Sequence, residues 1–369
     1  MPESRMKDLQ VTYRLECTAA EVEARAQAIA VEQSIEMPPE AVRSSRVREE
    51  VIGEVREIEA DGPFFLVRVG LSLATTGYDA GQLLNMLFGN TSLQADVSLL
   101  DFEPAAAAMA EFGGPRFGIE GLRARVGVIG RPLTCSALKP QGSTAAELAQ
   151  IAAALARGGV DLIKDDHGLA NQAFAPFAER VEAVQAAIAE ANRCSGGRTL
   201  YAPSLTGGPD ELLARYRLAR EAGAGMVMLA PMISGLSALQ RLAASEAGLP
   251  ILAHPAMAGA ARVSPPALIG KLFRLAGADA TIFPNHGGRF SYSPATCTAL
   301  AHAARRPWGG LRPAMPVPAG GMTLDRVDEM VSFYGRDTIL LIGGAVLGAA
   351  EGIEAAARAF VDSVAAHTA

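Results

Sequence analysis

The second part of the chain repeats a short apolar strand followed by a helix, and this repeat limits the fold more than any other feature. After Gly127, apolar stretches alternate with segments rich in Ala, Leu and Arg. The predicted strands are residues 134–138, 160–164, 199–204, 226–230, 250–254, 280–284, 316–319 and 338–342. Eight such units predict a (β/α)8 barrel. An open doubly wound sheet is the alternative, but the first strand lacks the GxGxxG turn that such a sheet would need.

The residues before the repeat predict a separate α+β domain at positions 1–125, with the barrel at 126–369. Short alternating segments predict strands, and Asp61-Gly62 between two of them indicates a hairpin turn. The predicted strands are 11–15, 51–58, 64–69 and 97–103, and the predicted helices are 18–31, 79–88 and one that begins near Pro104. Residues 111–125 are rich in glycine and are interpreted as the link between the two domains.

The composition excludes several classes of protein. A net charge of −6 argues against nucleic acid as a partner, because phosphate backbones need a basic face. The four cysteines are scattered, without the spacing of a zinc site, and are interpreted as reduced thiols. The polar first residues do not resemble a signal peptide, and no apolar run is long enough to cross a membrane. We therefore expect a cytoplasmic protein with no membrane partner.

Polar side chains gather where the second predicted strand ends. The run Gly158–His167 carries Lys164, Asp166 and His167 directly after an apolar stretch. Barrel active sites lie at the carboxyl ends of the strands, and Mg²⁺ prefers oxygen ligands. Asp166 supplies a carboxylate, and a desolvated neutral lysine at Lys164 can add CO₂ to become an anionic carbamate. A solvated strand end with no metal is the alternative.

Other strand ends carry further candidates. Lys139 after the first strand and His254 after the fifth have the chemistry of proton-transfer groups. A surface lysine and a packed structural histidine are the alternatives. Two pairs of glycines follow the last two strands, where barrels commonly bind phosphate through backbone amides, although glycines of this kind can serve packing alone. These are Gly320, Gly321, Gly343 and Gly344. The glycine-rich loop 285–290 can bring His286 or Arg289 over a substrate.

In the same order along most of the chain, these residues resemble the large subunit of ribulose bisphosphate carboxylase. The Gly-Gly-x-Asp-x-x-Lys-x-Asp run is similar to that family's metal motif, and Lys139-Pro140 is similar to its catalytic lysine. The resemblance implies that carbamylated Lys164, Asp166 and His167 hold Mg²⁺, with Lys139, Lys164 and His254 as catalytic groups. It also implies a homodimer with shared active sites, because Phe88-Gly89-Asn90 resembles a segment that places an asparagine in the neighbouring subunit's site.

The departures from the family pattern define the subgroup. His167 replaces a metal-ligand glutamate, Gln141 replaces a second lysine, and Pro255 replaces an arginine that holds a second phosphate. Met37-Pro38 stands where the family has a Thr-Trp phosphate site, and the loop 285–290 is short and lacks the lysine that steers CO₂. The chain is thus similar to the RuBisCO-like proteins, which do not fix CO₂.

The resemblance implies an isomerase of methylthioadenosine salvage. It would convert 5-methylthioribulose 1-phosphate into a 1-methylthio-pentulose 5-phosphate by Mg²⁺-assisted proton transfer through enediolates. The uncharged methylthio group fits the loss of cationic residues from the second phosphate site. The alternatives are the enolase that acts on 2,3-diketo-5-methylthiopentyl 1-phosphate, a decarboxylase of a sugar-acid phosphate, and a relative without catalytic activity.

Overall fold

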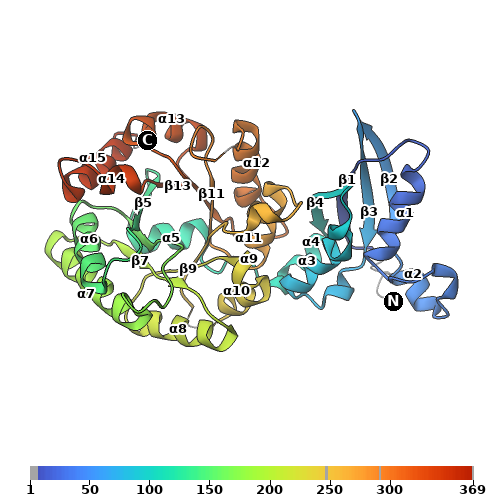
Figure 1. The fold of residues 1–369 in the computed structure, drawn as a ribbon, viewed down its shortest axis with the longest axis horizontal. Helices are drawn as coiled ribbons and strands as arrows, with labels where there is room; N and C mark the ends of the chain where they lie inside the picture. Colours follow the sequence, from blue (N-terminus) through green and yellow to red (C-terminus); the bar gives the residue numbers. More distant parts are fainter. Residues whose placement is uncertain (1–6, 246–247, 291, 368–369) are drawn as a thin grey trace.

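A computed structural model describes residues 7–245, 248–290 and 292–367, and it divides into a sheet domain and a barrel (Figure 1). Within these ranges the N-terminal sheet has four antiparallel strands in the order β2-β3-β1-β4. They are β1 (Leu9–Leu15), β2 (Glu54–Asp61), β3 (Phe64–Leu71) and β4 (Val97–Pro104). The predicted α+β character of this part is confirmed, including the hairpin at Gly62, whose φ of 60° suits glycine.

Alternation along β1 explains how this sheet packs. Every second side chain of the strand, from Leu9 to Leu15, is buried, and these residues share a core with helices α1 (Val22–Glu32) and α3 (Ala80–Phe88). The predicted strand at 51–58 begins later, at Glu54. The reason is a short helix, α2 (Ser45–Glu50), whose N-terminus is capped by the Ser44 hydroxyl.

The predicted barrel is confirmed, because every predicted strand overlaps an observed one. The strands are β5 (Leu133–Leu138), β6 (Leu162–Asp165), β7 (Leu200–Ala202) with β8 (Ser204–Leu205), β9 (Val227–Leu229), β10 (Ile251–Ala253), β11 (Ala280–Pro284), β12 (Met315–Ala319) and β13 (Ile339–Leu341). Pro203 divides the third of these into two pieces. The strands pair in parallel within two groups, in the orders β13-β5-β6-β7 and β12-β11-β10-β9-β8. Because β13 pairs with β5, the first and last strands lie side by side.

Helices surround the strands on the outside (Figure 1). The longer ones are α6 (Ala145–Arg157), α7 (Phe177–Ser195), α8 (Pro209–Glu221), α10 (Leu236–Ala243), α12 (Pro294–Arg305), α13 (Val327–Tyr334) and α15 (Ile353–Ala365). Shorter ones are α9 (Pro231–Ser234), the π-helix η6 (Pro266–Leu272) with α11 (Phe273–Leu275), and α14 (Gly344–Leu347). Local signals set their starts: Thr144 and Glu147 form a reciprocal capping box at α6. No helix within the described ranges is long and apolar enough to cross a membrane.

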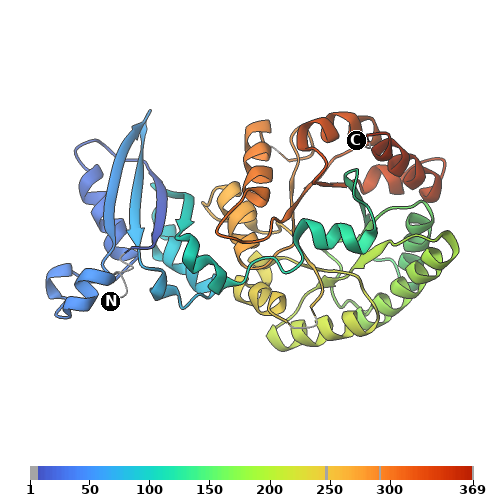
Figure 2. The same ribbon diagram turned by 180° about the vertical axis from the view of Figure 1, so that it is seen from behind.

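Residues predicted as a linker contain a helix that closes one end of the barrel. Helix α5 (Gly118–Val126) buries Ile119, Leu122 and Val126 against the inward-facing side chains of the strands. Figure 2 shows α5 lying across the barrel in the view from behind. The amphipathic pattern of this segment is short and interrupted by glycines, so its helical character depends on the apolar surface that it covers. The predicted domain boundary at 125 and 126 falls at the end of this helix.

Asp279 fastens α5 to the strands. Its Oδ1 accepts hydrogen bonds from the backbone N–H groups of Phe117 (2.7 Å) and Gly118 (2.8 Å), and its Oδ2 accepts one from Ile251 N–H (2.9 Å). Because the Asp279 side chain is buried, water cannot take its place as the acceptor for these three N–H groups.

The sheet domain is held to the barrel through β4. Leu99 of β4 exchanges backbone hydrogen bonds with the chain at Arg262 and Ser264. Beside this contact, Lys271 of η6 donates to Asp101 and Glu103, each at 2.6 Å, and to the Phe102 carbonyl at 3.0 Å. Because Lys271 is buried, this paired cluster gives the two domains a defined relative orientation.

Replacing Asp279 with Ala should lower the free energy of unfolding by at least about 3 kcal/mol, since two buried donors and one partly buried donor lose their acceptor. Urea unfolding followed by circular dichroism measures the change. Asp362→Ala, on an exposed position of α15, is the matched control and should change stability by less than about 0.5 kcal/mol. Equal stabilities of the two variants would contradict this role of Asp279.

Candidate active site

Strand alternation brings the predicted polar residues to one end of the barrel. On β5, Leu133 and Cys135 point into the barrel, so Lys139, four residues after Cys135, lies in the same phase just beyond the strand. On β6, Leu162 points inward, and Lys164 and then Asp166 follow at the same spacing. On β10, Leu252 points inward and His254 follows. All four residues therefore face the carboxyl end of the barrel, called here the mouth.

Asp166 is the centre of the polar contacts at the mouth. Its Oδ2 accepts a hydrogen bond from Lys139 Nζ at 2.7 Å, and its Oδ1 lies 3.0 Å from His167 Nδ1 and accepts from His167 N–H at 2.9 Å. Burial opposes ionisation, but hydrogen bonds from His167 and Lys139 outweigh it and hold the pKa of Asp166 well below its usual range. Asp166 is thus a carboxylate across the physiological pH range.

Lys164 lies deeper in the barrel and is almost completely buried. Its Nζ donates to the backbone carbonyl of Asp165 at 2.6 Å. Burial lowers the pKa of this amine, even though Cys135 and the neighbouring carboxylates raise it. A lysine with a lowered pKa is neutral more often than an exposed lysine is, and the neutral amine is the form that reacts with CO₂.

Asp165 fixes the end of β6 from behind. Its Oδ1 accepts from the Tyr201 hydroxyl at 2.7 Å, and its Oδ2 accepts from Arg180 Nε at 3.1 Å and from Ser204 N–H at 2.9 Å. Asp165, Arg180 and Tyr201 have no exposed surface. No role was predicted for Asp165. Its position between two inward-facing residues is the signal that identifies it as outward-facing and structural.

Two imidazole rings stack at the mouth. His167 and His254 have ring centroids 4.6 Å apart and planes within 9° of parallel. His254 Nδ1 accepts a hydrogen bond from Ala256 N–H at 3.1 Å, which places the proton of the neutral ring on Nε2. Burial, followed by the charges of Lys164 and His167, lowers the pKa of His254 to about 3. His254 is therefore neutral near pH 7 and can donate a hydrogen bond through Nε2.

The two glycine turns differ in what they contact. A Cβ atom built on Gly343 would lie 4.0 Å from Lys139 Cε, and one built on Gly344 would meet no atom within 4 Å. Neither glycine has a left-handed backbone, so neither conformation nor packing requires glycine at these positions. By contrast, Gly320 and Gly321 have φ values of 91° and 83° and pack against the loop after β11. The Gly343-Gly344 turn therefore leaves open space beside Lys139, as a bound ligand would need.

Asn90 lies in the N-terminal domain, where its side chain binds residues of that domain and not those of the barrel mouth. Its Nδ2 donates to Glu32 at 3.0 Å and to Glu36 at 2.9 Å, both in the N-terminal domain. Any contribution of Asn90 to a barrel site must therefore come from another copy of the chain.

The residues at the mouth fit a hard divalent cation. Among the described residues, no group of three or more His, Cys, Asp or Glu side chains is arranged to hold a metal ion. Asp166 supplies one ionised oxygen donor, and Lys164 would supply a second as a carbamate. Mg²⁺ usually keeps several water ligands and needs few protein oxygens, so this pair is sufficient. His167 Nδ1 is engaged with Asp166, and nitrogen suits Mg²⁺ poorly, so its predicted ligand role depends on Nε2.

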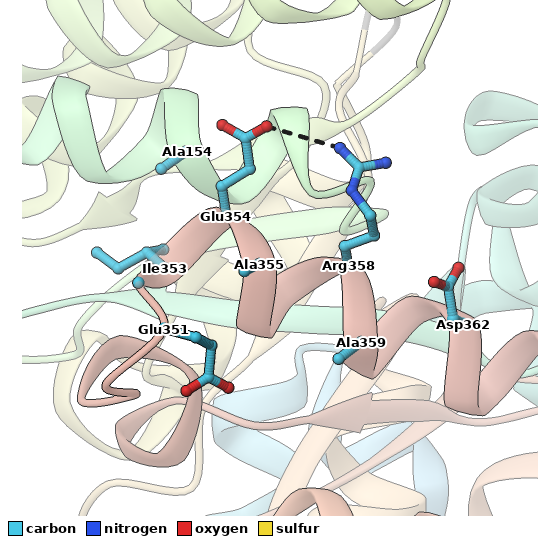
Figure 3. Close-up of a pocket in the computed structure, with 9 residues that line it drawn as sticks. Ala154, Glu351, Ile353, Glu354, Ala355, Arg358, Ala359 and Asp362 are labelled. Carbon is cyan, nitrogen blue, oxygen red and sulfur yellow. Dashed lines mark ion pairs between the residues drawn. The ribbon is translucent and has the colours of Figure 1, made fainter.

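A hollow lies on the outside of the barrel (Figure 3), between α6 and α15. It is lined by Ala154, Ile353 and the ion pair of Glu354 with Arg358. None of the predicted site residues lines it, and its carboxylates would repel a phosphate. The mouth is accordingly the candidate active site.

His254 gives this site a testable pH dependence. Because its pKa is lowered from 6.5 in the unfolded chain to about 3, the folded protein binds fewer protons, and stability falls as the pH drops below 6.5. Between pH 7 and pH 5, His254 alone should lower the free energy of unfolding by about 2 kcal/mol. His254→Gln should remove that decrease in urea unfolding of the metal-free protein, whereas His302→Gln on the exposed face of α12 should retain it. An unchanged pH slope in His254→Gln would refute the burial argument.

Comparison with known proteins gives the family. Residues 118–369 match the catalytic domain of the ribulose bisphosphate carboxylase large chain. The 5-methylthioribulose-1-phosphate isomerase of Rhodospirillum rubrum is 54% identical over 359 residues, covering 97% of this chain and 96% of that protein. The 2,3-diketo-5-methylthiopentyl-1-phosphate enolase of Geobacillus thermodenitrificans is 36% identical over 331 residues, covering 84% and 79%.

A solved structure supports the same family. The crystal structure of the Rubisco-like protein from Rhodopseudomonas palustris superposes with a TM-score of 0.90 and 50% identity, covering 97% of this chain and 98% of that one. The chain belongs to the family of the ribulose bisphosphate carboxylase large chain, and its similar relatives are RuBisCO-like proteins.

Proposed function

We propose that the protein isomerises 5-methylthioribulose 1-phosphate to a 1-methylthio-pentulose 5-phosphate. The observation that carries the proposal is the contact of Lys139 Nζ with Asp166 at 2.7 Å, beside buried Lys164 at the barrel mouth. This arrangement sets a proton-transfer group next to the carboxylate that would hold the metal. The name of the similar relative from Rhodospirillum rubrum points to the same reaction.

The reaction moves protons without changing the composition of the sugar. A carbon-bound proton next to the carbonyl is removed, an enediolate forms, and a proton returns to the former carbonyl carbon. A second shift of the same kind carries the carbonyl one carbon further. When bound, Mg²⁺ supplies electrophilic stabilisation to the carbonyl and hydroxyl oxygens as their charge grows.

The chain's own groups have distinct tasks in this scheme. Asp166 and carbamylated Lys164 would hold the metal, with His167 as a further candidate ligand. Lys139 is the candidate that transfers the carbon-bound proton, and the Lys164 carbamate is the second acid/base candidate. Neutral His254 donates a hydrogen bond to a substrate oxygen. The backbone amides of the turns Gly320-Gly321 and Gly343-Gly344 bind the single phosphate.

The alternative is the enolase reaction on the diketo phosphate, which the name of the relative from Geobacillus thermodenitrificans supports. It uses the same metal and a single proton abstraction at the carbon that carries the phosphate ester. The two reactions differ in their substrates, so substrate turnover distinguishes them.

The wild-type protein with Mg²⁺ and bicarbonate should convert 5-methylthioribulose 1-phosphate in D₂O into a new ketose. Since carbon-bound protons pass through Lys139 and the carbamate, NMR should show deuterium in the product. An inert ketose with turnover of the diketo phosphate would favour the enolase. No turnover of either substrate would sink both proposals.

Lys139→Ala and Lys164→Ala should each lower kcat by at least about a hundredfold. Lys7→Ala, at the exposed amine that binds the Glu49 carbonyl, is the matched control and should keep full activity. With ¹³C-bicarbonate, wild type should show a carbamate signal that Lys164→Ala lacks. An active variant at position 139 or 164 would remove the role assigned to that lysine.

Asn90 predicts an active site shared between two subunits. Asn90→Ala and Lys139→Ala should both be weakly active alone. After the two variants are mixed and allowed to exchange subunits, about a quarter of wild-type activity should return, since half of the dimers are mixed and each contains one intact site. Sedimentation should report a dimer. Failure to regain activity in verified mixed dimers would exclude the shared site.

A further inference from the structure

The loop after β11 is fastened to the Gly320-Gly321 turn backbone to backbone. Arg289 N–H donates to the Gly320 carbonyl at 3.1 Å. A Cβ atom built on Gly321 would lie 2.8 Å from Arg289 N, and one built on Gly288 would lie 2.0 Å from the Gly320 oxygen. Only glycines allow such a close approach, so the main chain of Arg289 is held beside the turn that follows β12.

The side chain of Arg289 also lies near this turn. Its guanidinium carbon is 5.3 Å from the centroid of the Phe290 ring. The ring in turn packs on Gly320, where a built Cβ atom would lie 3.0 Å from Phe290 Cδ2. Phe290 is 51% exposed despite its size, so it supports the guanidinium at the surface of the mouth rather than filling a core.

Two other cations near the turns, Arg326 and Lys139, are already engaged. Arg326 donates to both carboxylate oxygens of Glu329 at 2.9 Å and to the His286 carbonyl at 3.2 Å. Lys139 is paired with Asp166. Within the residues that the structure describes, no carboxylate or carbonyl pairs with the guanidinium of Arg289. This arginine therefore has its donors available at the edge of a predicted phosphate site.

We propose that Arg289 binds the phosphate group of the substrate at the Gly320-Gly321 turn and selects phosphorylated ketoses over unphosphorylated ones. The inference rests on the phosphate site of the proposed function. A planar guanidinium matches two oxygens of a phosphate monoester, and charge-assisted bonds of this kind are strong. In a chain with a net charge of −6, a local cation is needed to offset the repulsion of a dianion.

Inorganic phosphate is the probe, because its binding can be measured without turnover. Isothermal titration should show that Arg289→Ala weakens phosphate binding by at least about tenfold relative to wild type. Arg193→Ala is the matched control, since it removes the same charge from an exposed ion pair on α7, and should leave phosphate binding unchanged. Arg289→Lys should recover part of the loss. Thermal melting of each variant verifies folding.

Phosphate binding that is equal in Arg289→Ala and wild type, or absent from both, overturns the inference. The isomerase assay separates this result from the proposed function. An inert ketose together with phosphate binding that depends on Arg289 would remove the isomerase and leave the arginine's role intact. If the wild type is active and Arg289→Ala keeps the KM and the phosphate affinity, the isomerase proposal stands and the role of Arg289 is removed.

Discussion

Successive side chains of β6 point to opposite faces of the barrel wall, and the candidate site depends on this alternation. Lys164 and Asp166 point into the barrel, while Asp165 between them points outward to Arg180 and Tyr201. A shift of one residue would exchange the two sets and bury the site carboxylate behind the wall. The hydrogen bonds of Asp165 to a neighbouring strand and to α7 hold the end of β6 in register.

Burial and hydrogen bonding then shift the pKa values of neighbouring groups at the mouth in different ways. The pKa of Lys164 is lowered because the amine lies among barrel side chains, whereas the pKa of Asp166 is lowered by hydrogen bonds from His167 and Lys139. Burial also lowers the pKa of His254, to about 3, so this imidazole is neutral near pH 7. One mouth thus holds an ionised carboxylate, a neutral imidazole and a lysine whose pKa is lowered, which is the division of roles that the proposed proton transfer needs.

We propose that the loops around the mouth decide which substrate the barrel accepts. The glycines at 343 and 344 leave space beside Lys139, whereas those at 320 and 321 let the loop after β11 approach closely. That short loop presents Arg289 rather than a lysine, and Pro255 follows His254 where the family has an arginine. These differences are consistent with the proposed substrate, which carries one phosphate and an uncharged methylthio group.

The sequence by itself determined the barrel, the α+β character of the N-terminal domain with its hairpin, and the strand ends that carry Lys139, Lys164, Asp166 and His254. Strand periods and turn residues are local signals, which is why these features could be predicted. The sequence placed 111–125 in a linker, but α5 forms there because the open end of the barrel offers apolar surface. Only the tertiary structure decided that Asp165 faces away, that His167 stacks on His254, and that Asn90 binds Glu32 and Glu36. These contacts join residues from different elements, and their energies depend on burial and distance, which no local pattern specifies.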